Sequence, residues 1–493
     1  MTDLKALAAH QMTVAGLQSE FDAAAKAELA QLPKSPRSEA DLLDLRALLW
    51  SSIDNDDSRD LDQIEVTEAL PNGALKVLVG IAEVDSLVKK DSALDRHAAK
   101  NTTSVYTGVI TFPMLPEVLS TDLTSLNQDA DRAAIVTELE VAPDGTVTAS
   151  RVYRALVRNK AQLAYNGVGA WLAGTGPAPA KVAANPALAE ELRRQDAVAQ
   201  KLRAIRYAHG ALDLNTIEAN PVMKDGVVTA LEETQQNRAR ELIEDIMIAA
   251  NTAMAEFISA AGRSVLERVV KEPERWERIV TLAASLHETL PAAASSQALS
   301  VFLQKQRGKD PVHFPDLSLS IVKLMGPGEY IVQKTGAAHE GHFGLAVDDY
   351  THSTAPNRRF ADLVTQRMLK ALLAKAPSPY DDSALAAIAT QCNTQAAASR
   401  KVERFMRKAA AATLLSHRIG DVFDAIITGA NDKGTYARLL SPPAEGRVVS
   451  GEKGLQVGDR ARVTLTRVVP EKGFIDFAAS GGSATTHTGA ASR

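Results

Sequence analysis

The chain has 493 residues, of which 45% are hydrophobic, 23% charged and 4% aromatic, and its formal net charge is −5. This is the composition of an ordinary globular protein with a large core, and it excludes a fibrous or wholly disordered chain. The negative charge argues against a wholly basic nucleic-acid coat protein, although local basic channels can still bind a polyanion.

The chain has a single cysteine, Cys392. It therefore cannot form an intramolecular disulfide framework, and this fits a reducing compartment. The N-terminus lacks the apolar block of a signal peptide, and no window approaches the roughly 18 apolar residues of a membrane span. We expect a cytoplasmic protein that does not enter membranes, needs no obligate protein partner and is a monomer.

Residues 1–50 are predicted to be helical. One run of helical pattern ends near Pro33 and Pro36, and a second begins at a capping arrangement from Ser38 and ends near Trp50. The sequence therefore predicts a small N-terminal helical segment that resembles a helix-turn-helix.

From about residue 51 the hydrophobic period becomes that of strands. Pro71-Asn72-Gly73 predicts one hairpin, and Pro143-Asp144-Gly145 predicts a second between residues 135–141 and 147–153. Helical patterns then dominate from about 156 to 415, with strand-like pieces at 317–321 and 330–333. This region is therefore expected to mix α and β structure.

The C-terminal region returns to short strands separated by turns that contain glycine or proline, which predicts a small barrel. The predicted strands are 422–428, 436–439, 461–468 and 473–477. The tail after Ser480 is rich in small and polar residues and is expected to be disordered. The fold class is therefore predicted to be α+β.

An acidic segment precedes the first hairpin. Residues 54–62 contain five carboxylates, Asp54, Asp56, Asp57, Asp60 and Asp62. In Asp60-Leu61-Asp62 an extended backbone places both aspartates on one face and Leu61 on the other. Converging carboxylates can hold Mg²⁺, or Mn²⁺ in its place, and activate water for phosphodiester hydrolysis without a His, Cys or Ser nucleophile.

The acidic segment can also be interpreted as a calcium-binding loop or as a solvated loop. The spacing from Asp54 to Glu65 matches an EF-hand count, but Arg59 stands where that loop needs glycine, and a hairpin follows where a helix is required. A merely solvated acidic loop is the ordinary interpretation of a charge run and stays open at this point.

A second segment, residues 350–359, carries two adjacent arginines, Arg358 and Arg359. Pro356 suits the first turn of a helix, so Arg358 is expected to combine its planar fork with backbone N–H groups at a helix N-terminus. This favours phosphate binding. A structural ion pair with a loop carboxylate is the alternative for Arg358.

Five ordered blocks between residues 53 and 404 resemble the ribonuclease II/ribonuclease R exoribonuclease family, whose catalytic domain is called RNB. The blocks are Ile53-Asp54 with Arg59-Asp60-Leu61-Asp62, the stretch from Ser104-Val105-Tyr106 to Asn127, residues 242–251, residues 342–359, and residues 399–404. The resemblance implies a hydrolytic, processive 3′-to-5′ exoribonuclease that degrades single-stranded RNA from its 3′ end to nucleoside 5′-monophosphates.

The resemblance also implies roles for individual residues. Asp54, Asp60 and Asp62 match three of four catalytic aspartates, and Gln63 stands where the fourth usually lies. An amide can offer an oxygen to a metal but adds no charge, which puts second-metal affinity in question. Arg358 matches an arginine that contacts phosphate near the scissile bond.

Further residues are expected to contact RNA through the same resemblance. Tyr106 would stack on the base nearest the 3′ end, with Leu214 where an opposing aromatic usually lies. Glu244 and Asp245 would recognise ribose hydroxyls, with helix capping or an ion pair as the alternative for Glu244. The remaining RNA-binding candidates are Arg359, Glu403 and, in the terminal OB-fold module, Phe423, Tyr436 and Arg438.

The predicted organisation is a helical segment (1–50), a mixed α/β RNB catalytic domain (51–415), a C-terminal OB-fold β-barrel (416–480) and a tail (481–493). Longer family members carry two cold-shock domains before the acidic block, so a short variant and a less enclosed RNA entrance are expected. Gln63 leaves open a catalytically silent RNA-binding protein. A scaffold that recruits a partner through its helical front is the other alternative.

Overall fold

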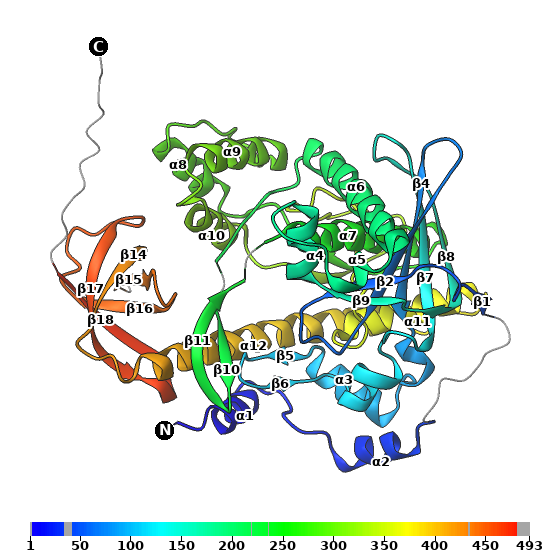
Figure 1. Ribbon diagram of the computed structural model, residues 1–493, viewed down its shortest axis with the longest axis horizontal. Coiled ribbons are helices and arrows are strands. Elements are labelled where there is room, and N and C mark those ends of the chain that lie inside the picture. The colour runs from blue at the N-terminus through cyan, green and yellow to red at the C-terminus, as the bar shows by residue number, and fades with distance from the viewer. Residues whose placement is uncertain (1, 34–41, 218, 235, 432–433, 481–493) are drawn as a thin grey trace.

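The computed structural model describes residues 2–33, 42–217, 219–234, 236–431 and 434–480. Figure 1 shows a body of helices around a sheet, and a small barrel, drawn in orange and red, beside the end of one long helix. The predicted α+β fold with a C-terminal barrel is confirmed. Within the described ranges, no helix combines the length and the apolar character that crossing a bilayer requires.

The centre of the body is a mixed sheet that has seven strands within the described residues. Its middle strands pair antiparallel, whereas β2 with β9 and β1 with β8 pair in parallel. In spatial order the strands are β1 (Leu43–Asp44), β8 (Val147–Arg158), β7 (Asp131–Val141), β4 (Leu75–Ala82), β3 (Gln63–Ala69), β2 (Ser51–Asp54) and β9 (Ala161–Ala164).

Both predicted hairpins are confirmed: β3 turns into β4, and β7 turns into β8. The turn glycines Gly73 and Gly145 have φ of +78° and +99°, which side chains rarely adopt. A Cβ on Gly145 would also lie 2.7 Å from the carbonyl oxygen of Lys201. The first hairpin matters for the site, because β3 begins immediately after Asp62.

Helices α6 (Pro186–Ala208) and α7 (Arg238–Ala260) pack on each other and on the sheet, and α11 (Phe360–Leu373) packs on α7 and β8. The core between them contains Trp50, Ile53 and Leu61. The smaller elements of this body are η1 (Val84–Ser86), α3 (Ala93–Asn101), β5 (Val105–Tyr106), β6 (Thr111–Phe112), η2 (Val118–Leu123), α4 (Tyr165–Leu172) and α5 (Ala180–Ala183).

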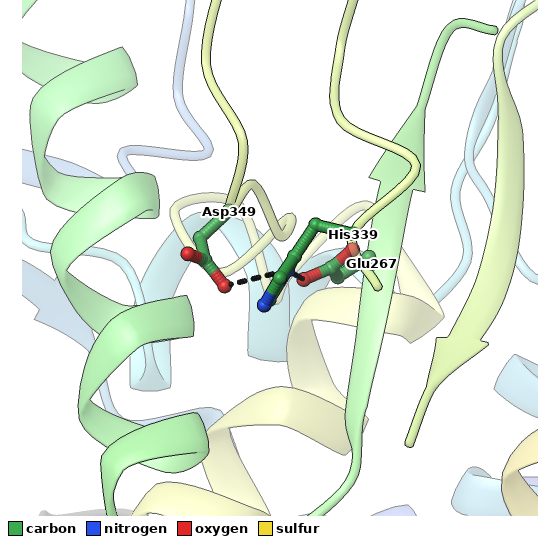
Figure 2. Close-up of side chains that lie close together, drawn as sticks. All are labelled: Glu267, His339 and Asp349. Atoms are coloured by element: carbon green, nitrogen blue, oxygen red, sulfur yellow. Dashed lines mark ion pairs between the residues drawn. The ribbon is translucent and has the colours of Figure 1, made fainter. Parts of the chain in front are cut away.

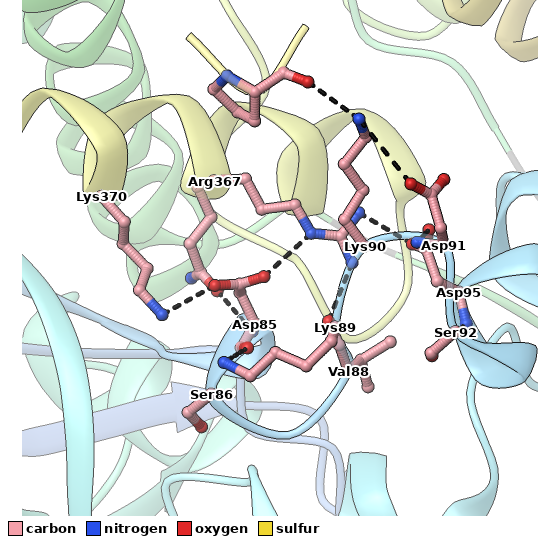
Figure 3. Close-up of polar contacts among 12 residues, drawn as sticks. Asp85, Ser86, Val88, Lys89, Lys90, Asp91, Ser92, Asp95, Arg367 and Lys370 are labelled. Carbon is pink, nitrogen blue, oxygen red and sulfur yellow. Dashed lines mark hydrogen bonds and ion pairs between the residues drawn. The ribbon is translucent and has the colours of Figure 1, made fainter. Parts of the chain in front are cut away.

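A buried ion-pair network joins α11 to η1 and to the first turn of α3 (Figure 3). The Arg367 guanidinium lies 2.9 Å from a carboxylate oxygen of Asp85 and 2.8 Å from one of Asp95, and it also donates to the hydroxyl of Tyr380 at 2.9 Å. Lys370 lies 2.7 Å from Asp85. The side chain of Arg367 is 3% exposed, so its partners replace nearly all of its hydration.

We expect Arg367→Met to lower the free energy of unfolding by about 3–5 kcal/mol, because it leaves the buried carboxylate of Asp95 without its cation and Asp85 with Lys370 alone. Chemical denaturation at neutral pH measures this. Lys90→Met is the matched control, since the Lys90–Asp91 pair at the edge of the network is exposed and is worth at most about 1 kcal/mol. If both variants lowered the free energy of unfolding equally, burial of the Arg367 ion pairs would not be the cause of the loss.

Three helices form a unit with its own apolar cluster: α8 (Trp276–Ser285), α9 (Ser296–Lys309) and α10 (Phe314–Met325). The predicted strand at 317–321 is therefore wrong. Phe314, Ser318 and Ile321 are the buried residues of α10, and their spacing is helical. The strand predicted at 330–333 is confirmed, because β13 (Glu329–Gln333) pairs with β12 (Val265–Val269).

The long helix α12 (Asp382–Leu415) runs from the body to the barrel (Figure 1). Asp381 caps it by accepting from the N–H of Ala384 at 2.7 Å, and none of its 34 residues is glycine or proline. It packs on β13, on the hairpin of β10 (Ala219–Lys224) and β11 (Val227–Glu233), and on the barrel. The helix thus connects the two ends of the molecule.

The barrel closes in the order β14-β15-β16-β18-β17. Its four predicted strands are confirmed, and β16 was missed. The core contains Phe423, with Leu415 of α12 and Leu231 of β11 packed into it. The elements are β14 (Val422–Asn431), β15 (Gly434–Leu439), β16 (Glu445–Ser450), β17 (Arg460–Val469), η3 (Pro470–Lys472) and β18 (Phe474–Ser480).

The N-terminal segment differs from its prediction. It forms two short helices, α1 (Leu4–Val14) and α2 (Ala23–Gln31), and α1 packs on α12. The second predicted helix is wrong over residues 42–50, where β1 pairs with β8 and Trp50 is buried. Residues 38–41 and the tail after Ser480 lie outside the described residues.

Candidate active site

The predicted acidic residues line one cavity of about 330 Å³, which we call the acidic cavity. Asp54 is the last residue of β2, and Asp60 and Asp62 lie on the segment that leads into β3. Tyr106 and Arg358 come from distant parts of the sequence. The residues lining the cavity are Asp54, Asn55, Ser58, Asp60, Asp62, Gln63, Tyr106, Tyr165, Arg240 and Arg358.

The segment around Leu61 is held on both sides by hydrogen bonds. The N–H of Leu61 donates to the hydroxyl of Ser125 at 2.9 Å, and its carbonyl accepts from the N–H of Leu126 at 2.9 Å. Leu61 is buried in the core, while the carboxylates on either side of it line the cavity. A buried apolar side chain between two aspartates thus fixes the direction of both.

Asp62 is the most buried of the three aspartates, at 2% exposure. Its Oδ1 accepts from the N–H of Asn357 at 2.9 Å, and its Oδ2 lies 3.6 Å from Nε of Arg358. Among the described residues, Oδ2 has no hydrogen-bond donor. Burial raises the pKa of Asp62 to about 7, although Arg358 and Asn357 oppose this shift.

Asp54 and Asp60 are less buried and differently held. Oδ1 of Asp54 accepts from the Ser58 hydroxyl and from the N–H of Asn55, both at 2.8 Å, and burial raises the pKa of Asp54. Asp60 accepts from the hydroxyl of Tyr106 at 3.3 Å. Asp56 and Asp57 are exposed, so the solvated-loop interpretation holds for those two residues.

These residues fit a hard divalent cation. Every candidate ligand is an oxygen, from three carboxylates and the amide of Gln63, as Mg²⁺ and Mn²⁺ prefer. The unpartnered Oδ2 of Asp62 supports this, because a buried carboxylate oxygen without a donor is costly unless a cation approaches it.

Arg358 lies in a turn before α11. The N–H groups of Arg358 and Arg359 both donate to the carbonyl of Ala355, and α11 begins only at Phe360. The predicted helix start at Pro356 is therefore wrong. The Arg358 side chain remains 43% exposed, and its 3.6 Å separation from Asp62 is too long for a hydrogen bond. Its guanidinium is thus free to bind a ligand in the cavity.

Tyr106 is brought beside Arg358 by backbone pairing. The N–H of Ser104 donates to the carbonyl of Arg358 at 3.0 Å, and that of Phe360 donates to the carbonyl of Thr102 at 2.8 Å. Tyr106 is 43% exposed, and its own N–H donates to Glu403 of α12 at 3.1 Å. The aromatic side chain of Tyr106 is thus held at the acidic cavity and remains partly exposed.

A second cavity, of about 240 Å³, also has these two residues in its lining, and we call it the arginine cavity. Tyr106 and Arg358 line both cavities. The further charged residues of the arginine cavity are Arg268, Arg359, Arg400 and Glu403. An acidic and a mainly basic compartment therefore share a tyrosine and an arginine.

Two family models match the chain. The RNB domain matches residues 42–375, and the RNase II-type exonuclease C-terminal S1 domain matches residues 421–480. The chain belongs to the RNB family of exoribonucleases. The predicted family is confirmed, and the barrel is its S1 domain, a module of the OB type.

Individual relatives agree with this RNB assignment. Ribonuclease R of Vibrio cholerae is 34% identical over 341 residues, which are 68% of this chain and 40% of that protein. The chain spans less than two thirds of the other ribonuclease R relatives as well.

Solved structures share the RNB fold over most of the chain. Mycoplasma genitalium RNase R, in complex with ribose methylated single-stranded RNA, superposes with a TM-score of 0.86 at 22% identity, covering 97% of this chain and 78% of that chain. Yeast Ssd1, a pseudonuclease, superposes with a TM-score of 0.69 at 17% identity, covering 88% and 54%. The RNB fold alone therefore does not decide whether a chain cleaves RNA.

Two candidates for RNA binding are occupied by ion pairs. Asp245 is 1% exposed, and its carboxylate pairs with Arg203 and Arg206. The guanidinium of Arg359 donates to both oxygens of Asp362, at 2.7 and 2.8 Å. Asp245 is therefore part of a buried ion pair in the RNB domain. Arg359 lines the arginine cavity, but its guanidinium is already hydrogen-bonded to Asp362.

Glu244 and Leu214 lie away from the acidic cavity. Glu244 is exposed on α7, where Gln236 approaches its carboxylate at 3.4 Å, so a ribose contact stays a prediction. Leu214 is partly buried against the apolar cluster of α8, α9 and α10, and it lines neither the acidic nor the arginine cavity.

The barrel candidates have three different environments. Phe423 is 6% exposed in the barrel core, so the prediction that it stacks on RNA bases is wrong. Tyr436 is partly buried and packs over Gly429. Arg438 lines a cavity of about 350 Å³ between the barrel, α12 and α10, and lies 3.2 Å from a carboxylate oxygen of Asp316.

Sequence reasoning missed Asn55 and Ser58 of the acidic segment, and it missed Tyr165 and Arg240, which come to the acidic cavity from elsewhere in the chain. Tyr165 begins α4, and the Arg240 guanidinium lies 4.4 Å from the centre of its ring. Arg240 also donates to the side chain of Asn55 at 2.9 Å. The signal of Tyr165 and Arg240 in the sequence was weak, because each stands near a helix start more than 100 residues from the acidic segment.

Burial makes Asp62 destabilising in the metal-free protein. Its pKa rises from 3.8 in the unfolded chain to about 7, which at about 1.4 kcal/mol per pKa unit is up to about 4 kcal/mol. No penalty exists below the lower value, where both states hold the proton. The penalty grows as the pH rises to about 7 and is constant above it.

We therefore expect Asp62→Asn to be more stable than the original chain at pH ~8 in EDTA, by up to about 4 kcal/mol, and equally stable near pH ~4. Denaturant unfolding across this pH range measures the difference. Asp57→Asn, in the exposed part of the same segment, should change stability by no more than about 0.5 kcal/mol. A constant difference at all pH values would contradict the assigned pKa.

Proposed function

We propose that the chain is a hydrolytic 3′-to-5′ exoribonuclease that degrades single-stranded RNA processively to nucleoside 5′-monophosphates. The observation that carries this proposal is the meeting of Asp54, Asp60 and Asp62 with Arg358 and Tyr106 around one cavity. Carboxylates, a free guanidinium and an accessible ring are the groups needed to hold a cation, a phosphate and a base.

Arg358 is the proposed phosphate ligand. Its planar fork suits two phosphate oxygens, and its exposed side chain faces the cavity that the aspartates line. Asp62 keeps the guanidinium near the cavity without a hydrogen bond that a phosphate would have to break. The last phosphodiester of an RNA strand is therefore expected to lie between Arg358 and the carboxylates.

The aspartates and Gln63 are the proposed ligands of Mg²⁺, with Mn²⁺ as the alternative. A divalent cation held there supplies charge neutralisation and a lowered water pKa. In the reaction a water oxygen forms the new bond to phosphorus, the bond from phosphorus to the 3′ oxygen breaks, and that oxygen leaves with a proton. The released nucleotide then carries a 5′-phosphate.

The phosphates of the RNA strand before its last nucleotide need positively charged side chains along their path. The arginine cavity continues from Tyr106 and Arg358 with Arg268 and the exposed Arg400. The cavity beside the barrel is lined by further cations, Lys323, Arg404, Arg407, Lys408 and Arg438. Positive side chains that follow the backbone, with an aromatic platform for a base, are typical of single-strand binding without sequence preference.

Tyr106→Ala is expected to weaken binding of a short RNA by about 1–3 kcal/mol, because a stacked base loses its platform. Tyr106→Phe keeps the ring and loses only the hydroxyl that donates to Asp60, so its affinity should stay close to that of the original chain. Fluorescence anisotropy with Ca²⁺ in place of Mg²⁺ measures both. Equal losses in the two variants would indicate a hydroxyl contact rather than stacking.

A catalytically silent RNA-binding protein is the second candidate. Gln63 removes one negative charge from the acidic cavity, and the fold is shared with a pseudonuclease. Against it stand the three aspartates and the unpartnered Oδ2 of Asp62, whose burial is costly in a protein that binds no cation.

The deciding experiment uses 5′-labelled single-stranded RNA, the same sequence as DNA, and the purified chain with Mg²⁺ or EDTA. Stepwise shortening of the RNA to a short limit product, with release of nucleoside 5′-monophosphates and no cleavage in EDTA, supports the exoribonuclease. Internal cuts would reject the exonucleolytic mode. Tight RNA binding without shortening would favour the silent protein.

A further inference from the structure

Three ligand-type side chains converge outside the acidic and arginine cavities: Glu267, His339 and Asp349. Glu267 lies on β12, and the other two lie on the loop that follows β13 (Figure 2). Nδ1 of His339 is 3.1 Å from Oδ1 of Asp349 and 3.5 Å from Oε1 of Glu267. One potential ligand atom from each residue lies within 4.8 Å of the others.

The burial of Glu267 is independent evidence that this cluster binds a cation. It is 0% exposed, and within the described ranges neither of its oxygens accepts a hydrogen bond. Oδ1 of Asp349 is also buried and without a hydrogen-bond donor among those residues. Figure 2 shows the His339 ring between the two carboxylates, each joined to it by a dashed line. Buried carboxylate oxygens that lie this close together are costly unless a cation lies among them.

The surroundings add negative charge to this position. Glu256 on α7 is close enough to Asp349 for their charges to interact unfavourably, and Asp348 precedes Asp349 on the loop. Arg268, the next residue on β12, points to the opposite face of the strand and stacks on Tyr330. The side chains around Glu267 therefore favour a cation over an anion.

We propose that Glu267, His339 and Asp349 form a structural site for a first-row divalent transition metal, with Zn²⁺ as the fitting ion. One imidazole nitrogen and two carboxylate oxygens suit Zn²⁺, and water can complete its coordination. Mg²⁺ and Ca²⁺ prefer ligand sets made of oxygen alone, so this site differs in chemistry from the acidic cavity.

The metal would join two parts of the chain that backbone pairing already brings together. The N–H of Phe343 donates to the carbonyl of Val270 at 2.8 Å, and that of Arg268 donates to the carbonyl of Tyr350 at 2.8 Å. The loop that makes these contacts also carries His339 and Asp349. A shared ion would anchor this loop to β12, immediately before the segment that leads to Asn357 and Arg358.

The test uses the full chain, freed of metal with EDTA and then dialysed, and ZnCl₂ as the probe. Isothermal titration measures affinity and stoichiometry, and thermal unfolding measures the shift in Tm. Glu267→Gln and His339→Ala each remove a proposed metal ligand. Asp348→Asn is the control, because it removes a negative charge from the same loop and leaves all three ligands in place. The double variant Asp60→Asn/Asp62→Asn abolishes any Zn²⁺ binding at the acidic cavity, so that only binding elsewhere is measured.

We expect the original chain, Asp348→Asn and the acidic-cavity double variant to share one class of Zn²⁺ site and a rise in Tm. Glu267→Gln and His339→Ala should lose that class or bind at least about tenfold more weakly, because even outer residues of metal sites cost that much. With Co²⁺ as a second probe, visible absorption should depend on His339.

Unchanged Zn²⁺ affinity and stoichiometry in Glu267→Gln would overturn the proposal. Loss of all Zn²⁺ binding in the acidic-cavity variant alone would overturn it as well. No RNA enters the assay, so its outcome is independent of the proposed nuclease activity.

Discussion

Asp62→Asn is expected to reduce RNA degradation at least about 10³-fold, because several kcal/mol of transition-state stabilisation depend on a cation at this carboxylate. Asparagine keeps the shape and can still accept from the N–H of Asn357, but it loses the charge that faces Arg358. Quantifying released 5′-monophosphates under single-turnover conditions measures the effect.

The same variant carries its own control for folding. Asp62→Asn is expected to be at least as stable as the metal-free original chain at the assay pH, so loss of activity cannot be ascribed to unfolding. RNA affinity, measured by anisotropy, should be retained or raised, since one negative charge near the phosphate is removed. An active Asp62→Asn variant would place the essential carboxylate elsewhere in the cavity.

Arg358→Ala is expected to lower the rate by about 10²–10³-fold, the usual cost of removing one group that stabilises charge in the transition state. Arg358→Lys should recover only part of the rate, because an ammonium group lacks the planar fork. Single-turnover rates at saturating RNA separate this effect from weaker binding.

Arg400→Ala is the matched control for Arg358. Arg400 is exposed and Arg358 is partly exposed, and both line the arginine cavity, but only Arg358 also lines the acidic cavity. Arg400→Ala should therefore weaken RNA binding in a salt-dependent way and leave the single-turnover rate nearly unchanged. If both variants lost rate equally, Arg358 would be an electrostatic contact rather than a group at the scissile phosphate.

Local chemistry in the sequence predicted much of the fold. The hairpin turns carry Pro-Asn-Gly and Pro-Asp-Gly, and their glycines adopt the positive φ that such turns require. Alternating hydrophobic residues between turns indicated the barrel strands. Family blocks that lie 300 residues apart, around Asp62 and Arg358, do meet at one cavity.

The failures also have physical reasons. Leu317 to Ile321 alternates like a strand, but the burial of Phe314, Ser318 and Ile321 follows a helical period that only the packing partners reveal. Asp245 and Glu244 were given one role, yet adjacent helix residues point about 100° apart. One of them is buried against arginines, and the other faces solvent.

Phe423 shows a third kind of failure. An aromatic residue on a barrel strand can face RNA or the interior, and its sequence neighbours do not decide which. In the structure, Phe423, Ala425 and Ile427 alternate inward and form the barrel core. Buried ion pairs and the direction of a closed barrel's strands depend on distant residues, which no local pattern contains.

The length of helix α12 fixes the distance between the barrel and the active-site region. Its 34 residues rise by about 51 Å at 1.5 Å each, and the absence of glycine and proline leaves no natural hinge. Helix α12 carries both Glu403, which accepts from the backbone N–H of Tyr106, and Lys408, which lines the cavity beside the barrel. Inserting one residue between them would advance the barrel by about 1.5 Å and rotate it by about 100°. If RNA reaches the acidic cavity past the barrel, as the proposed function requires, the number of residues in α12 sets which face of the barrel the strand meets.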